Sequence, residues 1–122
     1  MRERDGGAIV NLSSGTSRMV LTGVGAYAAT KTALNMLSLV AREESAPDGT
    51  VDSLVYPSVT ATELHDKLRA GAMGTGGGSL TPHSPRYVAK AIVRAVLTGE
   101  AEVVIPHGPE RPEEMEAAGS QT

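Results

Sequence analysis

The sequence predicts an α/β fold in which short parallel strands are joined by crossover helices. Three short runs rich in β-branched residues alternate with two segments whose apolar residues follow helical spacing. The order strand, helix, strand, helix, strand implies a parallel sheet with right-handed crossovers. The chain has 122 residues, of which 40% are hydrophobic and 20% charged, and this balance is typical of one soluble globular domain.

The first half of the chain predicts a strand, a long helix and a second strand. The first strand is expected over residues 8–13, and a glycine-containing loop leads from it to a helix over 26–44. The apolar residues of this helix occupy more than one face, so we expect it to be buried on two sides. A proline and an Asp-Gly turn within 45–50 end the helix, and the second strand over 51–56 is closed by Pro57.

The second half predicts one further helix and a third strand. Ser84 is a good N-cap, and Pro85 suits the first helical position. Apolar residues at helical spacing follow, with Tyr87 expected at the exposed start of the helix and Gly99 as its C-terminal stop. The third strand is expected over residues 102–105.

Two other segments are less regular. A short helix is predicted over residues 62–70, and the glycine-rich stretch 71–78 cannot hold one conformation unaided. We assign residues 1–106 to the folded domain. The tail, 107–122, is expected to be disordered because its prolines, glutamates and small polar residues offer nothing to pack.

Composition argues against several classes of function. A net charge of −3 without any run of Lys or Arg argues against nucleic-acid binding. No apolar run approaches the ~20 residues that a membrane span needs. The absence of cysteine excludes disulfides and thiolate chemistry and fits a reducing compartment, so we expect a cytoplasmic protein. The three histidines are far apart in sequence, so we expect no metal site.

One tyrosine and one lysine form the most informative pattern. Tyr27 and Lys31 are four residues apart, which places them on one face at the start of the first helix. An ammonium within ~4–6 Å stabilises a phenolate and can lower its pKa by ~1–3 units from ~10. Such a phenol can act as a general acid or base near neutral pH. Taken alone, the pair would more often be a surface tyrosine beside a solvated lysine.

The strand ends supply the setting for this pair. In open α/β sheets ligands bind at the carboxyl ends of the strands, which here follow residues 13, 57 and 106. Ser14 stands at the first of these ends, thirteen residues before Tyr27. Strand alternation sends Ser13 and Ser14 to opposite sides, so one of the two serines is expected to be structural.

Three spaced motifs together resemble the C-terminal half of a short-chain dehydrogenase/reductase. They are GAIVNLSS, then YAATK, then VDSLVYPSVTATEL, and the resemblance runs from about residue 7 to residue 64, with looser support over 85–106. Members of this family are NAD(P)-dependent oxidoreductases with a Rossmann fold. The resemblance implies a partial Rossmann fold, with three parallel strands and crossover helices from one half of a doubly wound sheet.

The resemblance also implies roles for individual residues. Ser14 would hydrogen-bond the substrate's carbonyl or hydroxyl oxygen, and Tyr27 would donate or accept the proton. Lys31 would lower the pKa of Tyr27 and hold the nicotinamide ribose hydroxyls. A segment that resembles the family's PGxxxT motif would lie against the nicotinamide carboxamide and phosphates; its residues are Pro57, Ser58, Val59, Thr60 and Thr62.

Two of these positions carry qualifications. Ser58 replaces the usual glycine of the motif, and Thr62 would serve equally well as a cap for the helix after it. The expected cofactor is NAD or NADP. The expected substrate is a small carbonyl compound or secondary alcohol.

Several features of the family have no counterpart in the sequence. These are the glycine-rich TGxxxGxG turn, the residue that distinguishes NAD from NADP, and the catalytic asparagine, for which Asn11 and Asn35 are wrongly placed. We therefore expect a truncated chain that does not turn over substrate alone, with its first strand deprived of one neighbour.

Two alternatives stay open. The chain could be a non-catalytic assembly module that pairs through its helices, giving a homo-oligomer through the helix of Tyr27. It could also belong to the extended branch of sugar epimerases and dehydratases, whose substrate regions are larger.

Overall fold

The computed structural model describes residues 1–58 and 82–113 of the chain. Its regular elements are β1 (Gly7–Leu12), α1 (Gly25–Ser45), β2 (Thr50–Tyr56), α3 (Pro85–Thr98) and β3 (Glu102–Val104). The predicted fold class and element order are confirmed, and each predicted bound differs from the observed one by at most one residue. The helix predicted over residues 62–70 lies outside the described residues.

The three strands form one parallel sheet in the order β1-β2-β3. β1 pairs with β2 residue by residue from Gly7 opposite Thr50 to Leu12 opposite Val55. Within the described part of the chain β1 is an edge strand.

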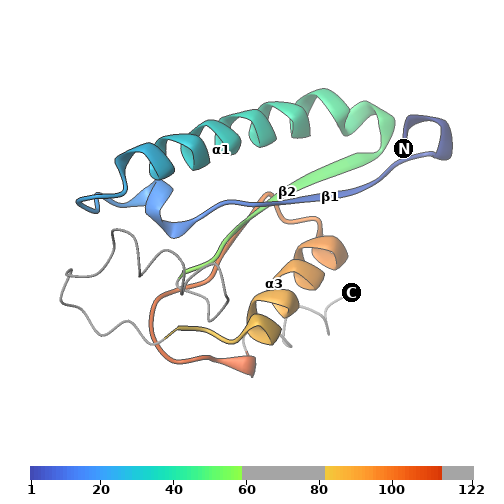
Figure 1. Ribbon diagram of the computed structural model, residues 1–122. Helices are drawn as coiled ribbons and strands as arrows, with labels where there is room; N and C mark the ends of the chain where they lie inside the picture. Colours follow the sequence, from blue (N-terminus) through green and yellow to red (C-terminus); the bar gives the residue numbers. More distant parts are fainter. Residues whose placement is uncertain (59–81, 114–122) are drawn as a thin grey trace.

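The two helices lie on opposite faces of the sheet (Figure 1). The chain passes from β1 to β2 to β3 in one direction across the sheet. The crossover that contains α1 and the crossover that contains α3 lie on opposite faces, so they have opposite hands. The expectation that both connections are right-handed is therefore wrong for one of them.

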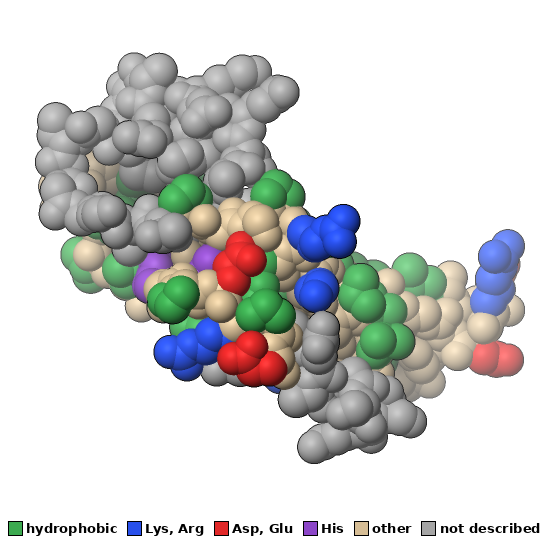
Figure 2. Space-filling view, turned by 90° about the horizontal axis from the view of Figure 1, so that it is seen from below, with side chains coloured by type: hydrophobic (Ala, Val, Ile, Leu, Met, Phe, Trp, Pro, Cys, Tyr) green, Lys and Arg blue, Asp and Glu red, His purple; other side chains and the backbone are tan. Residues whose placement is uncertain are grey.

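The α3 side of the sheet holds the apolar core. Ser84 caps the helix by accepting a hydrogen bond from the backbone nitrogen of Tyr87 (3.2 Å), and Gly99 ends it with a left-handed φ of 68°, as predicted. The buried cluster between helix and sheet consists of Val55, Tyr87, Val88, Ala91, Ala95, Val103 and Ile105. On the outer side, Figure 2 shows acidic and basic side chains interspersed among hydrophobic ones.

The prediction that Tyr87 lies at an exposed helix start is wrong. Its side chain is 3% exposed, and its ring lies 5.0 Å from that of His83. Tyr87 precedes Ala91 by four residues and Ala95 by eight, so it belongs to the buried stripe of the helix. Its hydroxyl is satisfied because it accepts a hydrogen bond from the backbone nitrogen of Arg111 (3.1 Å).

Residues just after the third strand also contact α3. The ring nitrogen Nε2 of His83 lies 2.8 Å from the carbonyl oxygen of Gly108, and Glu110 accepts a hydrogen bond from the backbone nitrogen of Ser84. The hydrogen bonds from Ser84 lower the pKa of Glu110. The described chain thus stays in contact with the domain as far as Arg111, while the division at residue 106 and the disorder of the tail stay predictions.

Helix α1 packs on the sheet through polar side chains. Lys31, Asn35, Ser38 and Arg42 recur at spacings of four, three and four residues, which is one helix face, and each hydrogen-bonds a residue on the sheet side. Arg42 donates both to the carbonyl oxygen of Asp52 (2.7 Å) and to that of Gly99 beyond α3 (2.8 Å).

The outer face of α1 is apolar and open. Met36, Leu37 and Val40 are 63%, 67% and 45% exposed. The expectation that this helix is buried on two sides is therefore wrong for the described chain, in which these three side chains stay exposed while Leu34 and Leu39 are half-buried. The apolar pattern in the sequence includes residues of both kinds.

The described residues contain neither a helix suited to a bilayer nor a cluster suited to a metal ion. Neither helix in the described ranges is long and apolar enough to cross a bilayer. No group of three or more histidine, aspartate or glutamate side chains in residues 1–58 and 82–113 could hold a metal ion.

We predict that Leu54→Ala destabilises the fold strongly. Leu54 is fully buried in the central strand, at 0% exposure, so truncation leaves a cavity and should lower the free energy of unfolding by about 2–5 kcal/mol. Leu97→Ala on α3, where the side chain is 56% exposed, is the matched control and should change it by less than about 0.5 kcal/mol. Urea denaturation measures both, and equal effects would show that β2 is not the centre of the core.

Candidate active site

The carboxyl ends of the three strands meet, as the sequence predicted. After β1, the backbone nitrogen of Gly15 donates to the carbonyl oxygen of Pro57 (3.0 Å), which follows β2. A Cβ atom on Gly15 would lie 3.5 Å from that oxygen and 3.9 Å from Nε2 of His107, which follows β3. Any side chain at Gly15 would therefore occupy the space between the strand ends.

The two serines after β1 have different environments. Ser13 is buried, at 3% exposure, and its Oγ donates to Oδ1 of Asn35 on α1. Ser14 begins the short 3-10 turn η2 (Gly15–Arg18), where its Oγ accepts a hydrogen bond from the backbone nitrogen of Thr16 (3.2 Å) and lies 2.9 Å from the Thr16 hydroxyl. Ser13 is thus a buried residue, whereas Ser14 is the partly exposed serine of the pair.

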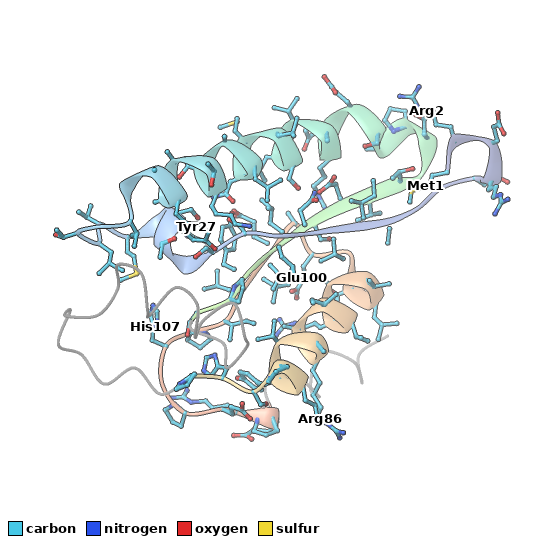
Figure 3. The ribbon with its side chains drawn as sticks, viewed as in Figure 1. Met1, Arg2, Tyr27, Arg86, Glu100 and His107 are labelled. Atoms are coloured by element: carbon cyan, nitrogen blue, oxygen red, sulfur yellow. The ribbon has the colours of Figure 1, made fainter. Side chains whose placement is uncertain are left out.

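Tyr27 and Lys31 lie in the first turns of α1, at the same end of the sheet as His107 (Figure 3). The Lys31 Nζ lies 5.8 Å from the centre of the Tyr27 ring and donates a hydrogen bond to the carbonyl oxygen of Leu12 (3.1 Å). Leu12 precedes Ser14 by two residues, so this bond joins the helix that carries Tyr27 to the strand end that carries Ser14. Tyr27 itself is 41% exposed and accessible from solvent.

The predicted cofactor segment is only partly described. Pro57 and Ser58 follow β2 at the same edge of the sheet, and the Pro57 carbonyl is bonded to the Ser14 turn through Gly15. Val59, Thr60 and Thr62 lie outside the described residues. Their assignment to a cofactor stays a prediction.

Tyr56, the other tyrosine near a strand end, is a packing residue. It is 2% exposed, its hydroxyl donates to Oε1 of Glu102 (2.6 Å), and the Arg18 guanidinium lies 5.0 Å from the centre of its ring. Burial, followed by the hydrogen bond and charge of Glu102, raises the pKa of Tyr56 to about 12. Because Tyr56 is buried and its hydroxyl is engaged with Glu102, it is not accessible as an acid or base for a ligand.

Sequence reasoning did not assign a role to the side chain that ties these parts together. Asn35 accepts from Ser13 and donates through Nδ2 to Oγ of Ser17 (2.9 Å). The available signal was its position four residues after Lys31, which places both side chains on one helix face.

Comparison with known proteins decides the family. Residues 1–72 match the model of the short chain dehydrogenase family. The chain belongs to this family. The resemblance to a short-chain dehydrogenase/reductase that the sequence motifs indicated is thereby confirmed.

Individual relatives agree with the assignment. The chain is 31% identical over 110 residues to the ketoacyl reductase HetN of Nostoc sp., a match that covers 89% of this chain and 37% of that protein. Among solved structures, a short-chain dehydrogenase from Streptomyces avermitilis matches with 28% identity and a TM-score of 0.70, over 99% of this chain and 49% of that one. A 4-hydroxyisoleucine dehydrogenase complexed with NADH matches with 28% identity and a TM-score of 0.64, over 84% and 45%. The chain spans less than half the length of each of these three proteins.

We predict that Tyr56 titrates well above the ordinary pKa of a tyrosine, which is ~10. Because its folded pKa is about 12 and an unfolded tyrosine titrates near 10, its contribution to stability is complete below pH 10 and is lost as the pH rises through 12. Phenolate absorbance against pH should therefore show a late phase that Tyr56→Phe removes. Glu102→Gln keeps an acceptor but removes the charge, so it should shift the late phase to lower pH; an unchanged profile in both variants would contradict the assignment.

Proposed function

We propose that this chain carries the proton-transfer site of an NAD- or NADP-dependent oxidoreductase that moves hydride between nicotinamide and a small carbonyl compound or secondary alcohol. Membership of the short-chain dehydrogenase family supports the reaction class. The observation that carries the proposal is the bond from Lys31 to the carbonyl oxygen of Leu12. This bond holds the helix of Tyr27 against the strand end that bears Ser14. The Ser14 hydroxyl, the Tyr27 phenol and the Lys31 ammonium therefore lie at one edge of the sheet.

The residues at this edge fit a nicotinamide cofactor. An ammonium has three N–H donors, and the bond to Leu12 uses one of them, which leaves donors for ribose hydroxyls. Pro57 and Ser58 stand at the adjoining strand end, where ligands of open α/β sheets bind. When bound, the reduced nicotinamide would supply the hydride that adds to the carbonyl carbon of the substrate.

Ser14, Tyr27 and Lys31 would carry out the proton transfer that accompanies the hydride transfer. Ser14 would donate its hydroxyl proton in a hydrogen bond to the substrate oxygen, and Tyr27 would transfer its proton to that oxygen as negative charge develops there. The Lys31 cation stabilises the negative charge then left on the Tyr27 oxygen. In the oxidative direction Tyr27 would accept the proton from the alcohol.

A second candidate function rests on the exposed apolar face of α1. Leu37 and Met36 are 67% and 63% exposed, and β1 offers one unpaired edge in the described chain. Both features suit an assembly module that pairs with another copy. Size-exclusion chromatography with and without NADPH distinguishes the two: cofactor-independent assembly without NADPH binding favours the module.

We predict that Tyr27→Phe lowers the rate of carbonyl reduction by about 10²–10⁴-fold, because the proton donor is removed while the ring is kept. The assay is NADPH or NADH oxidation by the purified protein. Tyr87→Phe is the matched control, since it removes a buried hydroxyl that only accepts from Arg111, and its rate should stay near normal. Near-normal turnover by Tyr27→Phe would exclude Tyr27 as the proton donor.

A further inference from the structure

We propose that Asn35 is a positioning residue whose side-chain amide holds the Ser14 turn at a fixed place relative to Tyr27 and Lys31. The inference rests on the proposed function for its catalytic consequence. Its structural part rests on hydrogen bonds among the described residues alone.

A chain of three hydrogen bonds runs from β1 through Asn35 to the turn. The Ser13 hydroxyl donates to Oδ1 of Asn35, and Nδ2 of Asn35 donates to Oγ of Ser17 (2.9 Å). The Ser17 hydroxyl in turn donates to the carbonyl oxygen of Ser14 (2.7 Å). One hydrogen bond therefore joins the Asn35 amide to Ser13. Two hydrogen bonds, by way of Ser17, join it to the backbone of Ser14.

The direction of this chain is determined by the number of protons. Each serine hydroxyl has one proton, and Ser17 uses its proton on the Ser14 carbonyl, so Oγ of Ser17 can only accept from Asn35. A flipped amide would present an oxygen to Ser17 and draw that proton away from Ser14. The site therefore requires a side chain with an acceptor and a donor on the same short stem, as asparagine provides.

The position of Asn35 explains why this matters for the proposed reaction. Asn35 follows Lys31 by four residues and Tyr27 by eight, so the three share one helix face. Lys31 holds Leu12, two residues before Ser14, while Asn35 holds Ser17, three residues after it. The segment that bears Ser14 is thereby bonded on both sides to the helix that bears Tyr27.

The same helix supplies a matched control. Ser38 is one turn further from the site, is 2% exposed, and hydrogen-bonds Asp52 while accepting from Nδ2 of Asn11 (3.2 Å). Ser38 therefore joins α1 to β1 and β2 as Asn35 joins it to the turn, but it makes no bond to residues 13–18 in the described chain. Loss of either side chain should weaken helix attachment, whereas only loss of Asn35 should release Ser14.

The kinetic test compares Asn35→Ala, Ser17→Ala and Ser38→Ala in the natural polypeptide. We expect Asn35→Ala and Ser17→Ala each to lower kcat by about 10- to 100-fold, because the Ser14 hydroxyl is displaced by up to about 1 Å from its productive position. KM for the carbonyl substrate should change by less than about threefold. The double variant should be no worse than either single one, since both break the same chain of bonds. Ser38→Ala should keep kcat within about twofold at a comparable loss in Tm.

A second readout needs no activity. The backbone nitrogen of Ser17 donates to the Ser14 carbonyl (3.0 Å), so hydrogen exchange at this amide reports whether the turn is held. Exchange should be faster by about tenfold or more in Asn35→Ala and nearly unchanged in Ser38→Ala. If Asn35→Ala does not fold, Asn35→Asp replaces it, because a carboxylate keeps the shape but cannot donate to Ser17.

The outcomes separate the inference from the proposed function. Full kcat in Asn35→Ala, or an equal loss in Ser38→Ala, overturns the positioning role. If the unmodified polypeptide reduces no carbonyl compound, the proposed function fails, and exchange at Ser17 still decides whether Asn35 holds the turn. Unchanged exchange in Asn35→Ala overturns the inference whatever the activity.

Discussion

The structure depends on the way α1 is attached to the sheet, which combines directional hydrogen bonds with the burial of Leu54 in β2. Lys31, Asn35, Ser38 and Arg42 all donate to or accept from residues on the sheet side. A net contribution of about 0.5–1.5 kcal/mol for each bond is modest, but a partner left unsatisfied in the interior costs about 1–3 kcal/mol. Sliding or rotating the helix by one residue would break several bonds together, so this interface fixes where Tyr27 stands.

The two sides of the sheet are built differently. The α3 side is an apolar cluster in which Val55, Val103 and Ala91 exclude water. The α1 side combines a polar interface, an apolar outer face and an edge strand whose residues are mostly exposed. In the described residues, the exposed apolar side chains of α1 and the open edge of β1 thus belong to the elements that carry the candidate active site.

Local pattern was enough to predict the elements and their order. Ser84 and Gly99 marked both ends of α3 because capping depends on residues within one turn of each other. Pattern failed where the deciding partner is distant in sequence. Tyr87 was assigned to the surface because the chain that satisfies its hydroxyl, at Arg111, lies 24 residues away.

The candidate site divides along the same line. Spacing was enough to bring Tyr27, Lys31 and the end of the first strand together, since four residues make one helical turn and strand ends gather in a parallel sheet. The choice of Ser14 over Ser13 as a candidate came from the family resemblance. It could not assign Asn35, because that role depends on bonds to Ser13 and Ser17, 22 and 18 residues away. Nor could apolar periodicity reveal that polar side chains of α1 hydrogen-bond the sheet side, because periodicity records where apolar residues lie and not which face finds a partner.

The polar attachment of α1 has a thermodynamic consequence. The heat capacity of unfolding rises with the apolar area that becomes hydrated and falls with the polar area, so the hydrogen-bonded groups of the α1 interface lower it and the apolar α3 cluster raises it. Apolar contacts weaken on cooling, whereas bonds such as that from Arg42 to Asp52 do not depend on the hydration of apolar surface. On cooling, the hydrogen bonds that attach the helix of Tyr27 should therefore weaken less than the apolar contacts of the α3 cluster.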